Sequence, residues 1–230
     1  VKVREEGGLG SDFNLSINGM SGNSIRYFID GMPLDAKGSG VTLANLPPNI
    51  IDRIEIYKGV VPAHLGTDAL GGAVNIITNQ QKKNFLDASY SIGSFHTHQF
   101  NVNGQYVTPK AGIIVKPTLS VNYSKNDYKV KNVEVWNEEK GKYVYEERKR
   151  FHDDYFSLLG QVEVGVTNKK WADNFFVTAS YSKTDKELQT GSIQTVVYGE
   201  ARRKSDSKNF SATYKKRNFF VDKLDVNALF

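Results

Sequence analysis

A two-residue alternation of apolar and polar side chains runs through most of residues 85–230 and constrains the fold more than any other feature of the sequence. Successive side chains of a β-strand point to opposite faces, so this period predicts strands and argues against helices. Each strand would then have one apolar face and one small, polar face. The clearest alternating segments are residues 86–92, 100–106, 115–123, 156–164, 175–181 and 210–214.

Two further features separate these segments from ordinary amphipathic strands. Aromatic residues such as Tyr90, Tyr106 and Phe156 lie at the ends of the apolar faces. The connections alternate in length, because residues 107–112 and 167–174 are short whereas 125–150 and 186–204 are long and polar. Aromatic girdles, with short turns on one side and long loops on the other, are typical of outer-membrane barrels. The alternative is a soluble β-sandwich, but strands of about ten residues are longer than usual and favour the barrel.

The first 79 residues have a different composition. Glycine is dense there, and short apolar runs at 25–29, 50–57 and 73–77 are separated by turn signals such as Asp30-Gly31. Strands are expected at 25–29, 54–58 and 73–77. Pro47-Pro48-Asn49 could open a short helical turn before one of these strands. The pattern predicts a compact domain of mixed α/β structure with a small sheet. A polar connector at 80–84 joins it to the alternating region.

Composition and motifs exclude several functions. The chain has 230 residues and no Cys, which removes disulfides and thiolate metal sites. The 30 basic and 25 acidic residues are interspersed, which indicates a solvated surface and not a nucleic-acid-binding face. No nucleophile elbow, P-loop or His-Glu-x-x-His motif occurs, so we expect neither an enzyme nor a cofactor. No run of 18 apolar residues occurs, so a transmembrane helix is not expected.

Three short motifs give only weak signals for a chemical function. Gly7-Gly8-Leu9-Gly10 is not followed by a helical pattern, so it does not indicate dinucleotide binding. Asp153 and Asp154 are adjacent at a strand start and should point to opposite faces, as loop-edge charges. His96 and His98 could hold a metal if they share one strand face, but solvated histidines in a turn beside Gly93-Ser94 are the alternative.

Residues 51–78 contain the motif that is most specific. They include Arg53-Ile54-Glu55-Ile56, then Lys58-Gly59-Val60-Val61-Pro62, and finally Gly71-Gly72-Ala73-Val74-Asn75-Ile76-Ile77-Thr78. Together with Ile17-Asn18-Gly19-Met20 and the Ile29-Asp30-Gly31-Met32-Pro33 segment, they resemble the later part of the plug domain of TonB-dependent outer-membrane receptors. The resemblance covers roughly residues 7–79. The alternating region resembles the barrel of that family by pattern and not by motif.

The sequence departs from the family in two places. Asn18 stands where the family usually has Arg, and Val60-Val61 separate Gly59 from Pro62 in a turn that usually reads basic-Gly-Pro. These departures leave ion pairing between plug and barrel open at both positions.

The resemblance implies a fold and a division of the chain. Residues 1–79 would be the C-terminal part of a plug domain, 80–84 a connector, and 85–230 the first strands of an incomplete 22-stranded antiparallel transmembrane barrel. About seven strand candidates occur, the last at residues 224–230. The first barrel strand, 85–93, would run outward from a periplasmic connector, so the long connections 125–150 and 186–204 would be extracellular.

The resemblance also implies a function in the bacterial outer membrane. The chain would belong to a receptor for energy-dependent uptake of a scarce nutrient such as an iron–siderophore, haem or cobalamin. Its partners would be outer-membrane lipid, a small-molecule or chelate ligand, and a TonB-type energy-coupling protein bound through an N-terminal segment ahead of this sequence. Two alternatives stay open: a surface receptor that binds glycans or peptides, and a soluble β-sandwich adhesin.

Candidate site residues follow from the resemblance and the alternation. In the family, charged plug residues face the barrel wall, and glycines form the tight turns of the plug. Aromatic residues in the long loops are candidates for ligand contact, because aromatics are enriched at binding surfaces. The expected plug–barrel contacts are Arg53, Glu55 and Lys58; the plug turns are Asp30, Gly31, Gly71 and Gly72; the ligand-contact candidates are Trp136, Tyr143, Tyr145 and Tyr198. Leu119, Val121, Tyr181 and Ala212 should face lipid, and Ser120, Asn122, Thr178 and Ser180 the lumen.

Overall fold

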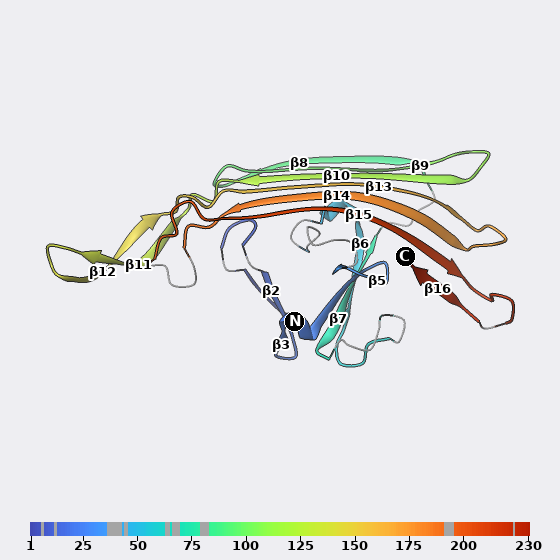
Figure 1. The fold of residues 1–230 in the computed structure, drawn as a ribbon, viewed down its shortest axis with the longest axis horizontal. Helices are drawn as coiled ribbons and strands as arrows, with labels where there is room; N and C mark the ends of the chain where they lie inside the picture. Colours follow the sequence, from blue (N-terminus) through green and yellow to red (C-terminus); the bar gives the residue numbers. More distant parts are fainter. Residues whose placement is uncertain are drawn as a thin grey trace.

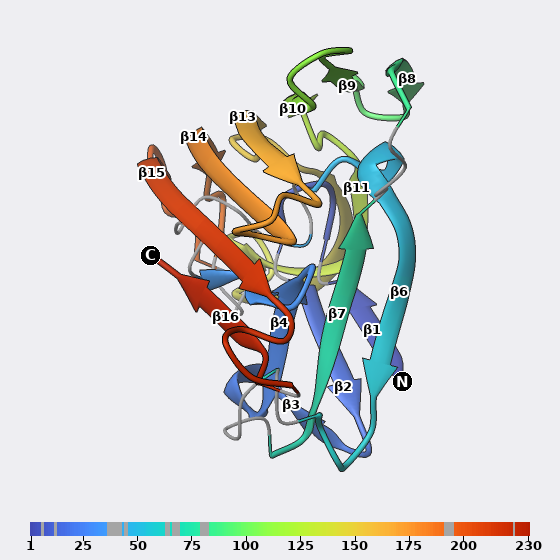
Figure 2. The ribbon, with the colours of Figure 1, turned by 90° about the vertical axis from the view of Figure 1, so that its right-hand side faces the viewer.

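The computed structural model is a long curved sheet with a group of shorter strands against its concave side (Figures 1 and 2). It describes residues 1–5, 7–11, 13–35, 43, 46–62, 65, 70–78, 83–190, 196–222 and 224–230. We call the seven-stranded sheet the wall, and residues 1–78 the plug region. Within the described residues, no helix is both long enough and apolar enough to cross a membrane.

The wall is an antiparallel sheet whose strands lie side by side in chain order. Its register is continuous: Leu119 lies opposite Val102 on one side and Gly160 on the other. The first strand begins and ends where the sequence predicts, at Phe85 and Gly93. The strands are β8 (Phe85–Gly93), β9 (Thr97–Val107), β10 (Ile113–Ser124), β13 (Tyr155–Thr167), β14 (Asn174–Glu187), β15 (Arg202–Lys216) and β16 (Val226–Leu229).

The two faces of the wall are inverted relative to a soluble sheet. Ser120 is 1% exposed, whereas its neighbour Leu119 is 37% exposed. The polar face is buried because the plug region lies against it, and the apolar face is open. A soluble β-sandwich would bury the apolar face, so its burial pattern differs from the one observed. Buried polar residues of the wall include Asn101, Asn103, Gln105, Ser120, Asn122, Ser157, Thr178 and Ser182; exposed apolar ones include Leu86, Tyr90, Ile92, Phe100, Val162, Val177 and Phe210.

The long connection between β10 and β13 is not the irregular loop that its polar composition predicts. It contains a two-stranded sheet of β11 (Lys129–Asn137) and β12 (Lys142–Lys149), which projects beyond the end of the wall (Figure 1). Val133 and Val135 alternate with charged and aromatic residues, and Val135 lies opposite Val144. This short period-two pattern between two charged ends is the signal for the hairpin.

The plug region contains two small sheets. The larger has the order β5 (Met32–Pro33), β4 (Ile25–Ile29), β7 (Gly72–Thr78), β6 (Ile51–Tyr57), with β4 and β7 parallel. The smaller consists of β1 (Lys2–Glu5), β2 (Phe13–Ile17) and β3 (Met20–Ser21). The run at 25–29 was predicted with its observed bounds. The strand expected at 54–58 starts earlier, at Ile51, and the one at 73–77 is longer by one residue at each end.

The mixed α/β character expected for the plug region is wrong for its described residues, which contain no α-helix. They form strands and single turns of 3₁₀-helix, such as η1 (Gly22–Ser24) and η4 (Pro48–Ile50). The expected helical turn after Pro47 therefore exists but ends at once, because strand β6 begins at Ile51. The short apolar runs are rich in β-branched residues, which favour strands over helices.

Candidate functional site: the seam between plug region and wall

An apolar contact fixes the plug region against the wall. Leu159 of β13 is 5% exposed and packs in one cluster with Ile29, Leu34, Leu46 and Ile76 of the plug region. Its neighbour Leu158 belongs to the opposite face of the strand, as the alternation requires. A wall side chain thus completes the plug region's own core.

Polar contacts flank this apolar one. The amide nitrogen of Asn49 donates to the carboxylate of Asp87 on β8, at 3.1 Å. The ammonium of Lys215 on β15 donates to the backbone carbonyl of Asp30, at 3.4 Å. The plug region is therefore tied to strands near both edges of the wall, by single bonds that can be exchanged for water at modest cost.

A cavity of about 70 Å³ lies in the seam, lined by both parts of the chain. Its polar lining includes the ion pair of Lys116 with Glu163, whose Nζ–Oε1 distance is 3.1 Å. The side chain of Asn103 also lines it and is 3% exposed, yet neither its Nδ2 nor its Oδ1 bonds to any residue that the structure describes. A polar cavity of this size has room for water that would satisfy such groups.

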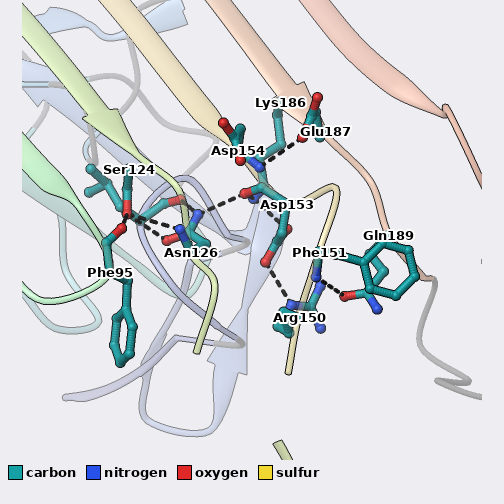
Figure 3. Close-up of polar contacts among 11 residues, drawn as sticks. Phe95, Ser124, Asn126, Arg150, Phe151, Asp153, Asp154, Lys186, Glu187 and Gln189 are labelled. Atoms are coloured by element: carbon teal, nitrogen blue, oxygen red, sulfur yellow. Dashed lines mark hydrogen bonds and ion pairs between the residues drawn. The ribbon is translucent and has the colours of Figure 1, made fainter. Parts of the chain in front are cut away.

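A third part of the seam lies at the end of the wall that carries the long connections (Figure 3). We call Ser124, Asn126, Arg150, Asp153 and Lys186 the loop-end cluster. The Asp153 carboxylate accepts from Lys186 Nζ at 2.6 Å and from Arg150 Nε at 2.7 Å. Asp153 is 4% and Lys186 5% exposed. A buried charge is tolerated only when it is paired and hydrogen-bonded, and this arrangement satisfies that requirement.

Asn126 joins the loop-end cluster to the plug region. Its Nδ2 donates to the Asp153 carbonyl at 3.0 Å and to the Leu9 carbonyl at 2.9 Å, while its Oδ1 accepts from the Ser124 hydroxyl at 2.9 Å. The Asn126 side chain is thereby satisfied on both its oxygen and its nitrogen. Residues that are 117 positions apart in the sequence meet at one carboxamide.

The Gly7-Gly8-Leu9-Gly10 loop fits closely against the same cluster. A Cβ added to Gly8 would overlap the Asn126 side chain, and one added to Gly10 would overlap the Tyr155 ring. Gly10 also has φ +80°, which side chains rarely adopt. Gly8 and Gly10, which do not belong to a nucleotide-binding motif, therefore allow this loop to approach the wall closely.

The charged plug residues expected to contact the barrel pair mainly among themselves. Arg53 Nε donates to Glu55 at 3.0 Å, and Glu55 also accepts from the Tyr57 hydroxyl at 3.0 Å and from Asn75 Nδ2 at 3.2 Å. These contacts lower the pKa of Glu55, with the Tyr57 hydrogen bond as the largest cause, although desolvation opposes it. Lys58 is exposed just after β6. A contact of Arg53, Glu55 or Lys58 with the barrel stays a prediction.

The predicted turn residues adopt the backbone geometry that their types favour. Asp30 and Gly31 have φ of 51° and 80° between the paired residues Ile29 and Met32, as in a type I′ hairpin. The Asp30 carboxylate then accepts from Thr78 Oγ1 at 2.6 Å and fixes the turn to β7. Asn18, the departure from the family motif, forms a turn of the same kind with Gly19, with φ of 52° and 82°. Asn suits this left-handed position better than Arg would.

Gly71 and Gly72 lie where the chain enters β7. Gly72 has φ +133°, and a Cβ there would overlap the carbonyl oxygen of Tyr57 on the neighbouring strand. A Cβ on Gly71 would lie 3.0 Å from the carbonyl oxygen of Ser24. Gly72 therefore needs to be glycine for close backbone approach, and a side chain at Gly71 would require a small shift of its neighbours.

The aromatic ligand-contact candidates lie outside the seam. Trp136 and Tyr143 face each other across β11 and β12, with ring centroids 5.2 Å apart, and are 52% and 54% exposed. Tyr145 on the same face is 71% exposed, and Tyr198 in the other long connection is 50% exposed. These side chains are open to a ligand, but the contact itself stays a prediction.

The two histidines do not share a strand face, and His96 lies in the turn that the sequence favours over a metal site. His96 lies in the turn before β9 with φ +55°, and its ring is 3.8 Å from Asp127. His98 lies on β9, where its Nδ1 is 2.8 Å from the Tyr90 hydroxyl. The left-handed turn breaks the alternation on which the metal hypothesis depended. In the described part of the chain, no group of three or more His, Cys, Asp or Glu side chains could hold a metal ion.

Sequence reasoning missed most of the seam. The sequence predicts Asp153 as a loop-edge charge, and this is wrong because Asp153 is buried between Lys186 and Arg150. The Asp154 carboxylate does point elsewhere, as predicted, and accepts from Tyr123. For Leu159 a signal existed, because it is an apolar residue on the polar face of an alternating strand. For Asn126 we find no sequence signal, since its partners are distant in the chain.

Comparisons with known proteins agree with this architecture. A family model described as TonB-dependent Receptor Plug Domain matches residues 1–73. The curated "Vitamin B12 transporter BtuB" of Vibrio vulnificus (strain CMCP6) is 30% identical over 82 residues, which cover 36% of this chain and 14% of that protein. The chain therefore spans only a small part of this relative.

Solved structures resemble the chain over nearly its whole length. The alignment with the FrpB iron transporter from Neisseria meningitidis includes 99% of this chain and 36% of the FrpB chain, with a TM-score of 0.66 and 19% identity. The alignment with the pyoverdine outer membrane receptor FpvA from Pseudomonas aeruginosa PAO1 includes 94% of this chain and 31% of the FpvA chain, with a TM-score of 0.60 and 12% identity. At these identities the likeness shows the fold.

Proposed function

We propose that the chain is part of a TonB-dependent receptor and takes part in energy-coupled uptake of a scarce nutrient across a bacterial outer membrane. The match of residues 1–73 to the plug-domain family supports this proposal, and receptors of that family are outer-membrane proteins and not enzymes. The observation that carries the proposal is the inverted wall: its apolar face is open and its polar face is buried against the plug region. An open apolar face of this extent needs a partner, and lipid is the one that suits a sheet with aromatic residues near its strand ends.

In this proposal the chain comprises the C-terminal part of the plug domain (1–79), a connector (80–84) and the first strands of the barrel (85–230). Most of the connector lies outside the described residues. The wall has seven strands, with β8 and β16 at its edges. A 22-stranded barrel would continue from both edges, which removes the exposed backbone groups that make edge strands prone to aggregation.

The strand directions support one orientation. The plug region enters from the periplasm, so β8 runs outward and the turn at 94–96 is extracellular. The same count makes 108–112 and 168–173 periplasmic, and it makes the hairpin of β11 and β12 and the connection 188–201 extracellular. The longer connections then lie outside the cell, as in other barrels of this type.

The ligand would be a small molecule or chelate, such as an iron–siderophore, haem or cobalamin. It would bind from outside, at the exposed aromatic face of the hairpin and at the outer surface of the plug region. A TonB-type protein would then pull on a segment ahead of this sequence and rearrange the plug. The two single hydrogen bonds between plug region and wall support such movement, because water can replace each of them. The polar cavity of the seam has room for that water.

The test is growth of a deletion strain on a panel of scarce nutrient sources: iron chelates, haem, cobalamin, glycans and peptides. The proposal predicts loss of growth on one of the first three sources, restored by the full-length gene only when the energy-coupling protein is present. Growth that depends on the receptor but not on the coupling protein would contradict it. Dependence on a glycan or peptide source would replace the proposed ligand class.

A further inference from the structure

The loop-end cluster lies where three segments of the chain meet. These are the plug-region loop Gly7–Ser11, the end of β14 at Lys186, and the two chain segments 125–128 and 150–153, which we call the hairpin foot. The hairpin foot connects β11 and β12 to the wall. If the hairpin moves relative to the wall, the hairpin foot must change its conformation.

A continuous series of contacts crosses the hairpin foot. The Arg150 guanidinium lies over the Tyr128 ring, 5.5 Å from its centroid, and the Arg150 backbone N–H donates to the Tyr128 carbonyl at 2.9 Å. Arg150 also binds the Asp153 carboxylate at 2.7 Å. The position of Asp153 therefore depends on the base of the hairpin.

Asp153 in turn fixes the contact with the plug region. Its carbonyl oxygen accepts from both Lys186 Nζ, at 2.7 Å, and Asn126 Nδ2, at 3.0 Å. The same Asn126 nitrogen donates to the Leu9 carbonyl. Because Asn126, Asp153 and Lys186 are buried, a break at any of these three residues leaves a buried polar group without a partner, which is costly.

The fit of the plug-region loop makes the contact sensitive to position. Gly8 and Gly10 approach Asn126 and Tyr155 so closely that no side chain fits between them. If Asn126 or Asp153 shifts, the loop loses both its hydrogen bond and its packing. Packed contacts of this kind switch between discrete arrangements and do not deform smoothly.

We propose that the loop-end cluster is a clamp that couples the extracellular hairpin to the plug region, with Asn126 and Asp153 as its positioning residues. The proposal rests on the proposed function, in which the hairpin meets the ligand and the plug moves. Displacing the hairpin foot loosens the Gly7–Ser11 loop from the wall. In the resting receptor the clamp holds that loop in place.

The test compares two adjacent carboxylates in the full-length receptor by hydrogen–deuterium exchange, without ligand. Asp153→Asn removes the charge that holds Lys186 and Arg150. Asp154→Asn is the matched control, because that carboxylate accepts from the Tyr123 hydroxyl, whereas Arg150 Nε and Lys186 Nζ donate to Asp153. The clamp predicts that exchange in the segment 7–11 rises roughly tenfold or more in D153N and stays unchanged in D154N.

Exchange in the wall segment 157–166 reports whether D153N is generally unfolded, and it should stay as in the wild type. If that segment is also destabilised, Asn126→Asp provides the second test, because a carboxylate of the same shape cannot donate to the Leu9 carbonyl. Unchanged exchange at 7–11 in both variants would overturn the clamp. This readout needs neither ligand nor uptake, so it is independent of the growth experiment that tests the proposed function.

Discussion

Leu159 of the wall and Ile29 of the plug region share one buried apolar cluster, although they lie in different sheets. Replacing Leu159 by Ala should destabilise the plug region by about 2–5 kcal/mol, the usual cost of a cavity at a buried leucine. The measurement is the unfolding transition of the plug region in the full-length receptor. Leu158→Ala, on the opposite face of the same strand, is the control and should change that transition far less.

Gly72→Ala should destabilise the plug region by about 1 kcal/mol or more, and Gly72→Val by more, because any Cβ overlaps the Tyr57 carbonyl and φ is +133°. Gly160 offers a matched control, since a Cβ there meets nothing within 4 Å. Surface levels of the two alanine variants can be compared by quantitative immunoblotting. Equal levels for Gly72→Ala and Gly160→Ala would show that close backbone approach at Gly72 does not matter.

The lipid-facing assignment predicts a difference between the two faces of the wall. Leu119→Arg should cost about 2–4 kcal/mol, the range for a cation placed against lipid near the middle of the bilayer. Ser180→Arg, on the polar face, should cost much less. Ser120, Asn122 and Thr178 are unsuitable for this comparison, because they are buried and an arginine would not fit there. Similar losses of folded protein for both variants would refute the assignment.

Glu55 should make the plug region sensitive to acid. Its hydrogen bonds lower its pKa below the usual value of 4.5, so the folded state favours the carboxylate. The resulting stability is fully present above the pKa of the unfolded chain and is lost as pH falls through the lower, folded pKa. Between about pH 6 and pH 3, Glu55→Gln should therefore lose less thermal stability than the wild type. Glu139→Gln, in the exposed hairpin turn, should lose as much as the wild type.

The sequence carried enough information for the strands but not for the seam. Alternation placed β8 to the residue, because a period of two is local and the polar face of Asp87, Ser89 and Ser91 is uninterrupted. The hairpin of β11 and β12 was missed because its strands are short and highly charged. The pairing of Asp153 with Lys186 was missed because the sequence does not distinguish a buried ion pair from two solvated charges. The two residues become neighbours only in the folded chain.

The central claim is the orientation of an outer-membrane wall, and labelling of single cysteines tests it most directly, since this chain has no Cys. Cysteine would be introduced into the full-length receptor at Glu139 or Glu200, and separately at Lys110 or Lys170, all exposed positions in connections between strands. In intact cells, a membrane-impermeant thiol reagent should label the first pair and not the second, while permeabilised cells should show labelling of all four. Labelling of Lys110 or Lys170 variants in intact cells, with Glu139 and Glu200 variants protected, would contradict the account.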